Sequence, residues 1–226
     1  AKKYEIPIIE DAAEALGSMY NNKPMGSFGD FGIYSFNGNK IITTSSGGAI
    51  ISNNMEYIKK AKFLSTQAKD DFPHYEHSEI GYNYRMSNIC AAIGLGQLEV
   101  LFERVNKRRS IFNYYKDKLS SIPFLSFVDD IDGFYSNRWL TTIIVSEDSV
   151  INREDIRLRL LENNIESRPL WKPMHIQPVF SSHKSYLNGV SEDLFKRGLC
   201  LPSGSIIKQK DLERVVYVIK RLFNES

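Results

Sequence analysis

The sequence has few cysteines, almost no charge imbalance and no long hydrophobic run. Cys90 and Cys200 are the only two cysteines; they are too few for a disulfide framework, and their apolar neighbours indicate buried free thiols. A formal net charge of +2 does not indicate a general nucleic-acid or anionic-membrane binder. No apolar stretch approaches the ~20 residues that cross a bilayer, and no signal-peptide pattern opens the chain. We therefore expect a cytoplasmic protein without a nucleic-acid or membrane partner.

What the sequence does contain is typical of a globular protein. Hydrophobic residues make up 42% of the chain and charged residues 25%, which excludes a disordered, collagen-like or coiled-coil protein. Residue 1 is Ala rather than Met, and a strand-like run at Ile6–Ile9 follows within a few residues. We expect an N-terminal part of the protein to precede this chain. We find no metal-binding pattern.

The pattern of apolar residues predicts an α/β part followed by a small α+β part. Strand-like runs occur at Ile6–Ile9, Phe31–Phe36 and Ala49–Ser52, and helical spacing extends from Asn88 to Leu119. After Pro123 two strands precede two helices, an order that favours a small α+β domain. We place the boundary inside the long helix, which gives one domain over residues 1–105 and a second over residues 106–226.

Two residues that could carry chemistry follow predicted strands. Asp11 ends the first strand region and Lys40 lies in a loop after another strand. The carboxyl ends of strands in open α/β sheets are where ligands bind, and a lysine amine there can form a Schiff base with a carbonyl compound. The alternative, twice as probable from spacing alone, is a solvated loop lysine and an aspartate that caps a helix.

Other features of the sequence are weaker indications of function. Ser35 and the turn at residues 43–48 offer hydroxyls and backbone N–H groups that could hold phosphate, but ordinary turns have the same composition. The basic residues at 104 and 107–109 are best interpreted as a solvated helix face rather than a nucleic-acid patch. The aromatic side chains of Phe72, Tyr75, Tyr82 and Tyr84 either line a substrate cleft or pack their own loop.

Taken together, several motifs resemble one family in order along the chain. The chain closely resembles the DegT/DnrJ/EryC1/StrS family of pyridoxal-phosphate (PLP) sugar aminotransferases. The motifs that carry this resemblance are Ile8 to Gly17, Gly26 to Gly32, Tyr34 to Lys40, Thr43 to Gly48, Gly81 to Asn88, Ala91 to Glu99, Arg168 to His175 and Leu201 to Gly204.

The resemblance implies a fold and a cofactor. The fold is the fold-type I PLP transferase fold (aspartate-aminotransferase-like, α/β), with the later part of the large domain and a small α+β C-terminal domain present here. Lys40 matches the lysine that forms a Schiff base with PLP and later moves a proton between cofactor and substrate. Asp11 matches the acid that pairs with the pyridine nitrogen.

The resemblance also implies roles for five further residues. Glu14 matches a position near the cofactor ring that is often Gln or His in the family, so Glu is a departure. Ser35 matches a phosphate contact, and Asn83 matches the asparagine that reaches the phosphate in the neighbouring subunit, which implies a homodimer with a shared site. Arg85 matches a residue near the amino-donor carboxylate, and His175 matches one near the sugar nucleotide.

The activity that the resemblance implies is transfer of an amino group from L-glutamate to a nucleotide-linked keto sugar. The sequence from Ser35 to Lys40 resembles that of the branch acting on UDP-linked 4-keto-6-deoxy sugars. The alternative is a non-catalytic scaffold or regulatory relative with the same fold, and a nucleic-acid-binding module is a weaker third. We expect this chain alone to bind the cofactor poorly or not at all.

Overall fold

The computed structural model describes residues 1–225 and separates into two compact units. The first comprises Ala1–Asn106 and Asp130–Trp139, and the second comprises Lys107–Asp129 and the chain from Leu140 onward. The first break between the two units lies between Asn106 and Lys107. Residues 130–139, which the sequence analysis placed in the second domain, belong to the first unit instead.

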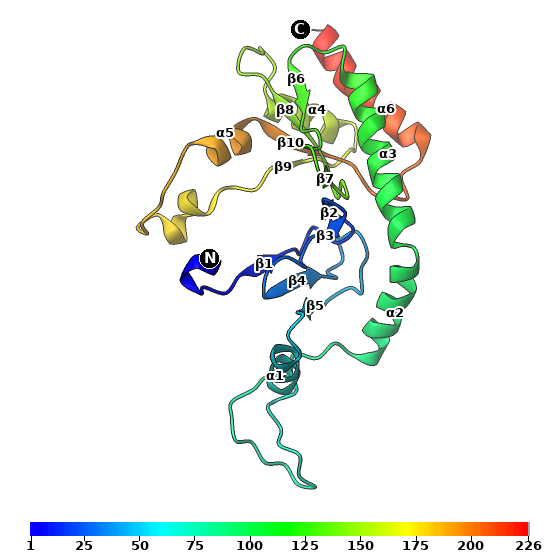
Figure 1. Cartoon of the computed structure of the whole chain (residues 1–226). Coiled ribbons are helices and arrows are strands. Elements are labelled where there is room, and N and C mark those ends of the chain that lie inside the picture. The colour runs from blue at the N-terminus through cyan, green and yellow to red at the C-terminus, as the bar shows by residue number, and fades with distance from the viewer. Residues whose placement is uncertain (226) are drawn as a thin grey trace. The chain divides into compact units, whose positions relative to one another are not determined.

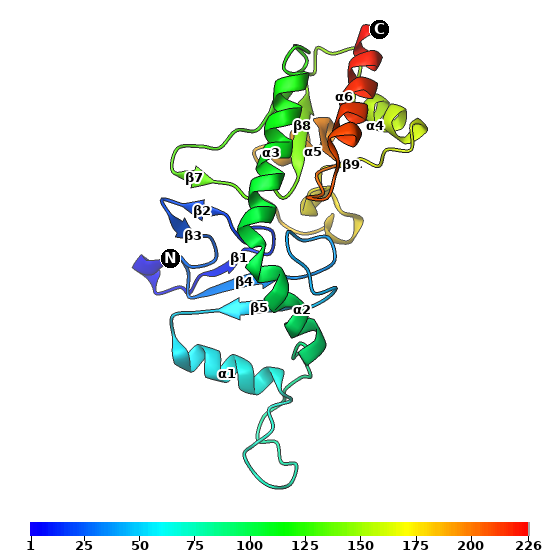
Figure 2. The same cartoon turned by 90° about the vertical axis from the view of Figure 1, so that its right-hand side faces the viewer.

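A three-stranded sheet organises the first unit. It contains β1 (Ile9–Asp11), β4 (Phe31–Ser35) and β5 (Gly48–Ile51) in the order β1-β4-β5 (Figures 1 and 2). β1 and β4 are parallel, and β5 is antiparallel to β4. The first strand starts three residues later than the sequence predicts and ends at Asp11. Just before it, the Ile8 carbonyl accepts the N–H groups of Asp30 and Phe31.

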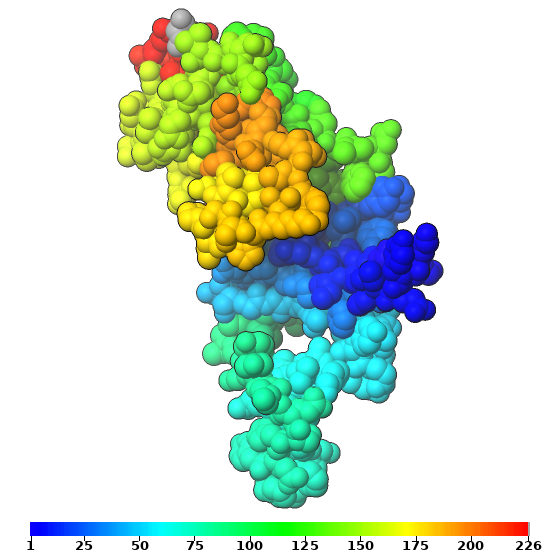
Figure 3. All heavy atoms as spheres, turned by 90° about the vertical axis from the view of Figure 1, so that its left-hand side faces the viewer, coloured from blue at the N-terminus to red at the C-terminus, as the bar shows by residue number. Residues whose placement is uncertain are grey.

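A second small sheet and two flanking segments complete the sheet region. β2 (Met19–Tyr20) pairs with β3 (Lys23–Pro24) and with β7 (Phe134–Tyr135). Near the N-terminus the short 3₁₀ helix η1 covers Lys2–Tyr4. The helix α1 (Met55–Ser65) begins after Asn54, whose side chain accepts two backbone N–H groups of the first turn. The loop that follows projects from the unit (Figure 3).

The long helix of the sequence analysis is two helices. α2 (Asn88–Glu99) begins after the N-cap Ser87, and α3 (Leu101–Leu119) follows one residue later. The separation arises at Val100, whose N–H bonds the carbonyl of Gln97 in a tightened turn. No helix within residues 1–225 is long and apolar enough to cross a membrane.

The second unit has a four-stranded antiparallel sheet with its own core. The sheet order is β6 (Leu125–Phe127), β8 (Thr141–Val145), β10 (Gly198–Leu201) and β9 (Arg168–Pro169). The remaining elements are α4 (Arg153–Glu162), η2 (Met174–Ile176), η3 (Pro178–Phe180), α5 (Val190–Arg197) and α6 (Gln209–Asn224). Buried side chains of α3, α4 and α6 form one hydrophobic cluster with β8 and β10; they include Tyr115, Leu160 and Ile219.

Candidate active site

The topology of the first unit brings the ends of three strands to one edge of the sheet. Because β1 and β4 are parallel and Asp11 is opposite Ile33, the last residues Asp11 and Ser35 lie at the same edge. β5 runs the other way, so its first residue, Gly48, pairs with Ser35 there. The edge therefore carries a carboxylate and a hydroxyl, as expected for a ligand-binding edge.

The two acids at the end of β1 have different partners. Successive side chains of a strand point to opposite faces, and the Glu10 carboxylate accepts the N–H of Gly26 at 2.8 Å and those of Phe28 and Gly29. Glu10 thus holds the glycine-rich loop. The exposed Asp11 accepts only one of the described bonds, from the N–H of Ala13 at 3.2 Å. No helix begins directly after Asp11, where the described chain forms turns, so Asp11 is not the helix cap of the alternative interpretation.

Lys40 lies in a loop that closes at this sheet edge. The loop is closed by the N–H of Phe36, which donates to Gly47, and by the N–H of Thr44, which donates to Phe36. Although loop lysines are normally solvated, the Lys40 side chain is only 13% exposed. Its amine forms an ion pair with Glu14, in the turn directly after β1. The structure therefore brings together Lys40, Glu14 and the strand end at Asp11.

Two residues that the sequence analysis missed complete the surroundings of the lysine. The amine of Lys40 lies 5.0 Å from the centroid of the Trp139 ring, within range of a cation–π interaction. Asn137, which is 3% exposed, donates to the carbonyl of Glu14 at 2.8 Å. Both lie about a hundred positions from the lysine, where no spacing rule applies. The signal that could have indicated them is a Trp and an Asn in a polar loop just before a strand.

The turn at residues 43–48 uses several of its hydroxyls internally. The Thr43 hydroxyl donates to the Phe36 carbonyl and accepts the N–H of Ser45, and the Thr44 hydroxyl donates to the Ser46 carbonyl. Gly47, with φ of +94°, supplies the left-handed turn that L side chains disfavour. The turn thus shapes the lysine loop. The Ser35 hydroxyl accepts the N–H of Asn37 at 3.4 Å.

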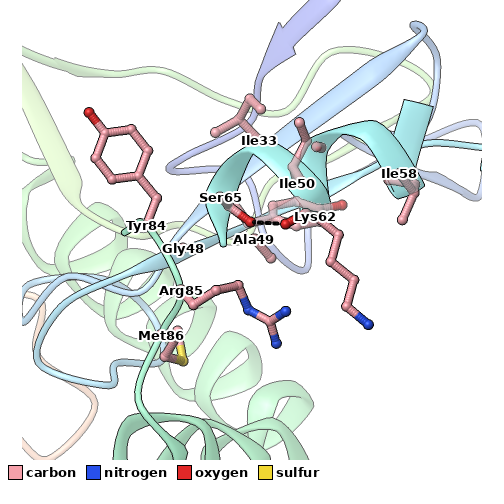
Figure 4. Close-up of a pocket in the computed structure, with 12 residues that line it drawn as sticks. Ile33, Gly48, Ala49, Ile50, Ile58, Lys62, Ser65, Tyr84, Arg85 and Met86 are labelled. Atoms are coloured by element: carbon pink, nitrogen blue, oxygen red, sulfur yellow. Dashed lines mark hydrogen bonds between the residues drawn. The ribbon is translucent and has the colours of Figure 1, made fainter. Parts of the chain in front are cut away.

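Asn83 and Arg85 follow the projecting loop, and Asn83 lies near the end of α1. Asn83 forms an isolated bridge with Thr66 and is exposed. Arg85 lines a cavity of about 640 Å³ together with apolar residues of β4, β5 and α1, including Ile33, Ile50 and Ile58. Its guanidinium group extends into this space, as does the side chain of Lys62 (Figure 4). The cavity lacks acidic side chains among its lining residues, so it suits a carboxylate.

His175 lies in the second unit, in the short helix η2. Its Nε2 atom is 2.7 Å from the Glu192 carboxylate of α5, and the ring is largely buried. The sequence analysis kept open a structural histidine and a substrate contact. The bond to Glu192 fixes one ring nitrogen and leaves Nδ1 as the second polar atom of the ring.

The residues at the sheet edge fit PLP in the kind of groups they offer. An amine can bond the aldehyde, a carboxylate can pair with the pyridine nitrogen, and hydroxyl and backbone N–H groups can hold the phosphate. Lys40, Asp11 and Ser35 supply these three kinds of group. Glu14 would have to release Lys40 for that bond to form, because it is the acid paired with the amine.

The fold and this lysine-bearing edge define a fold-type I α/β protein. The structure resembles that of a DegT DnrJ EryC1 StrS aminotransferase from Brucella abortus, with a TM-score of 0.86, 28% identity, and coverage of 98% of this chain and 58% of that one. The sequence profile of the DegT/DnrJ/EryC1/StrS aminotransferase family matches residues 1–220. The chain belongs to this family of PLP-dependent sugar aminotransferases, as the motifs predict.

Two curated relatives are similar to this chain over nearly its whole length. The chain is 52% identical to the Bacillus subtilis protein named "Putative pyridoxal phosphate-dependent aminotransferase EpsN", over 98% of this chain and 58% of that protein. It is 36% identical to the GDP-perosamine synthase of Escherichia coli O157:H7, over 98% of this chain and 59% of that enzyme. The chain thus spans less than two thirds of the length of these relatives.

Proposed function

We propose that the protein carrying this chain transfers an amino group from L-glutamate to the keto carbon of a nucleotide-linked sugar, with PLP held on Lys40. The observation that carries the proposal is the shielded Lys40 amine, paired with Glu14 at the sheet edge where Asp11 and Ser35 end their strands. Family membership supports the same reaction.

Each residue has a proposed task. Asp11 holds a proton on the ring nitrogen, and Ser35 contributes to phosphate binding. Lys40 anchors the cofactor and, once released, moves a proton to or from the substrate carbon. When bound, PLP supplies an electron sink for that carbon. Glu14 holds the Lys40 ammonium in the cofactor-free protein and accepts its proton when the amine reacts.

Three further residues are proposed to bind substrate or a partner's cofactor. Arg85 can hold a glutamate carboxylate through two parallel hydrogen bonds, and the acid-free cavity it lines supports that role. His175, oriented by Glu192, contacts the sugar nucleotide. Asn83 lies beside the projecting loop and reaches the cofactor phosphate of a second subunit, which makes a homodimer part of the mechanism.

We infer that the sugar is a UDP-linked 4-keto-6-deoxy sugar, because the sequence from Ser35 to Lys40 resembles that branch of the family. The name of the GDP-perosamine synthase relative points to a GDP sugar as the main competitor. A shared fold does not decide between them.

A substrate panel tests both levels of the proposal. The protein at its natural length is supplied with PLP, L-glutamate and UDP-, GDP- and dTDP-linked keto sugars, and 2-oxoglutarate release is measured. We expect release with the UDP 4-keto sugar and none in Lys40→Ala. Release with the GDP sugar alone overturns the UDP assignment. Bound PLP without release from any sugar favours a non-catalytic scaffold.

A further inference from the structure

Residues 130–139 form a separate segment that returns to the first unit. The chain belongs to the second unit both before Asp130 and after Trp139. Within the segment, β7 pairs with β2, and Gly133 accepts the N–H of Asn21 at 2.7 Å. Gly133 has a φ of +81°, and a Cβ atom there would lie 2.5 Å from Asn21. The segment is thus fastened to the first unit ahead of Asn137.

Asn137 fixes the turn that carries Glu14. Its side-chain amide donates to the carbonyls of Glu14 at 2.8 Å and Leu16 at 2.9 Å, and its backbone N–H donates to the Ser18 hydroxyl at 2.9 Å. A buried amide that satisfies two carbonyls holds them in one arrangement. The position of the Glu14 carboxylate therefore depends on Asn137.

Trp139 fixes the loop that carries Lys40. Its indole N–H donates to the carbonyl of Asn39 at 2.8 Å, and its backbone N–H donates to the Asn137 side chain at 2.9 Å. The ring itself lies against the Lys40 amine. One side chain thus bonds the residue before the lysine and faces the reactive atom.

We propose that Asn137 and Trp139 are positioning residues for Lys40, and we call the pair the lysine clamp. The inference rests on the proposed function for its purpose. Lysine has four rotatable side-chain bonds, and directing its amine toward one point carries an entropy cost. The indole face attracts the ammonium and excludes water on one side, while Glu14, placed by Asn137, holds it from another. The clamp therefore presets the direction in which the amine meets an aldehyde.

A reagent smaller than PLP tests the clamp in the cofactor-free protein at its natural length. Formaldehyde with a borohydride reductant methylates accessible amines, and peptide mass spectrometry follows Lys40 against Lys59, which is 67% exposed. We expect Lys40 to react at least tenfold more slowly than Lys59. Trp139→Leu should raise the Lys40 rate at least fivefold. Trp139→Phe, which keeps a ring, should stay within threefold of the wild type.

Trp171→Leu is the matched control, since Trp171 is the only other tryptophan of the chain and is exposed in the second unit. It should leave the Lys40 rate unchanged within twofold. Equal Lys40 rates in the wild type and Trp139→Leu would overturn the clamp. Should Trp139→Leu fail to fold by circular dichroism, Asn137→Asp replaces it; loss of the two amide bonds should raise the Lys40 rate, and an unchanged rate would count against the clamp.

A second measurement separates the clamp from the proposed function. PLP bound to a lysine absorbs in the visible range, and this absorbance reports both capture and loss on dilution. We expect Trp139→Leu to lose PLP at least tenfold faster than the wild type, and Trp139→Phe to lie between them. No visible band in the wild type would contradict the proposed function while leaving the methylation test intact. A wild-type band with identical loss from all variants would contradict the clamp alone.

Discussion

The two units differ in the size of their buried hydrophobic clusters. In the second unit, side chains from α3, α4 and α6 pack with β8 and β10 into one large buried cluster. In the first unit the buried cluster consists of Ile41, Ile42, Leu101 and Val105, and α2 contains no buried residue. The residues with proposed chemistry lie mainly in the first unit. Within this chain, the large buried cluster lies in the second unit, and the sheet edge with the reactive groups lies in the first.

Replacement of Lys40 should give the largest effect and should act on chemistry alone. Lys40→Ala removes the amine that bonds the cofactor and moves the proton, and we expect turnover to fall by on the order of 10⁴-fold or more. Unfolding of the second unit should be unchanged, since Lys40 makes no contribution to its core. Visible absorbance and 2-oxoglutarate release measure the first effect, and urea unfolding measures the second. A Lys40→Ala protein with near-normal turnover would contradict the assignment.

A core substitution in the second unit should act on stability rather than on chemistry. Leu160 is completely buried on α4, and Leu160→Ala should lower the free energy of unfolding by about 2–5 kcal/mol through lost burial and a cavity. Its neighbour Leu161 is exposed, so Leu161→Ala is the control and should cost under about 1 kcal/mol. Urea unfolding checks both. Equal losses in the two variants would show that the second unit is not the well-packed body described here.

Much of this arrangement follows from the sequence, because strand ends and helix periods are local. The helical spacing predicted from Asn88 to Leu119 is present in α2 and α3, and the acid at position 11 does end a strand. Helical periodicity continues through Val100, so it could not reveal the tightened turn that divides α2 from α3.

The surroundings of Lys40 could not be predicted, because they depend on long-range contacts. Asn137 and Trp139 reach the lysine from a segment whose assignment to the first unit no local pattern encodes. Similarly, Glu10 and Asp11 look equivalent as an acidic pair. Only the alternation of side chains and the position of the glycine-rich loop separate a structural acid from an exposed one.

Glu14→Gln should change turnover less than Lys40→Ala does and stability less than Leu160→Ala does. The pair with Lys40 is partly exposed, so we expect the free energy of unfolding to change by under about 1 kcal/mol. Turnover should fall by on the order of tenfold, because Gln can hold the amine but cannot accept its proton. Glu56→Gln, which removes the solvated pair with Lys59, is the control and should change neither. An unchanged rate in Glu14→Gln would show that Glu14 has no part in proton movement.

The two cysteines report the difference between the units without any substitution. Cys200 lies on β10 of the second unit and is 5% exposed, and burial raises the pKa of its thiol to about 11. At pH 8 only about one Cys200 thiol in a thousand would then be the reactive thiolate. Cys90 lies on α2 and is half-buried rather than buried as its apolar neighbours suggested.

We expect a disulfide reagent at pH 8 to modify Cys90 in the folded protein and Cys200 only in urea. Because the raised pKa disfavours the thiolate, native modification of Cys200 should increase only as the pH approaches 11. Rapid modification of Cys200 in the folded protein at pH 8 would contradict its burial on β10.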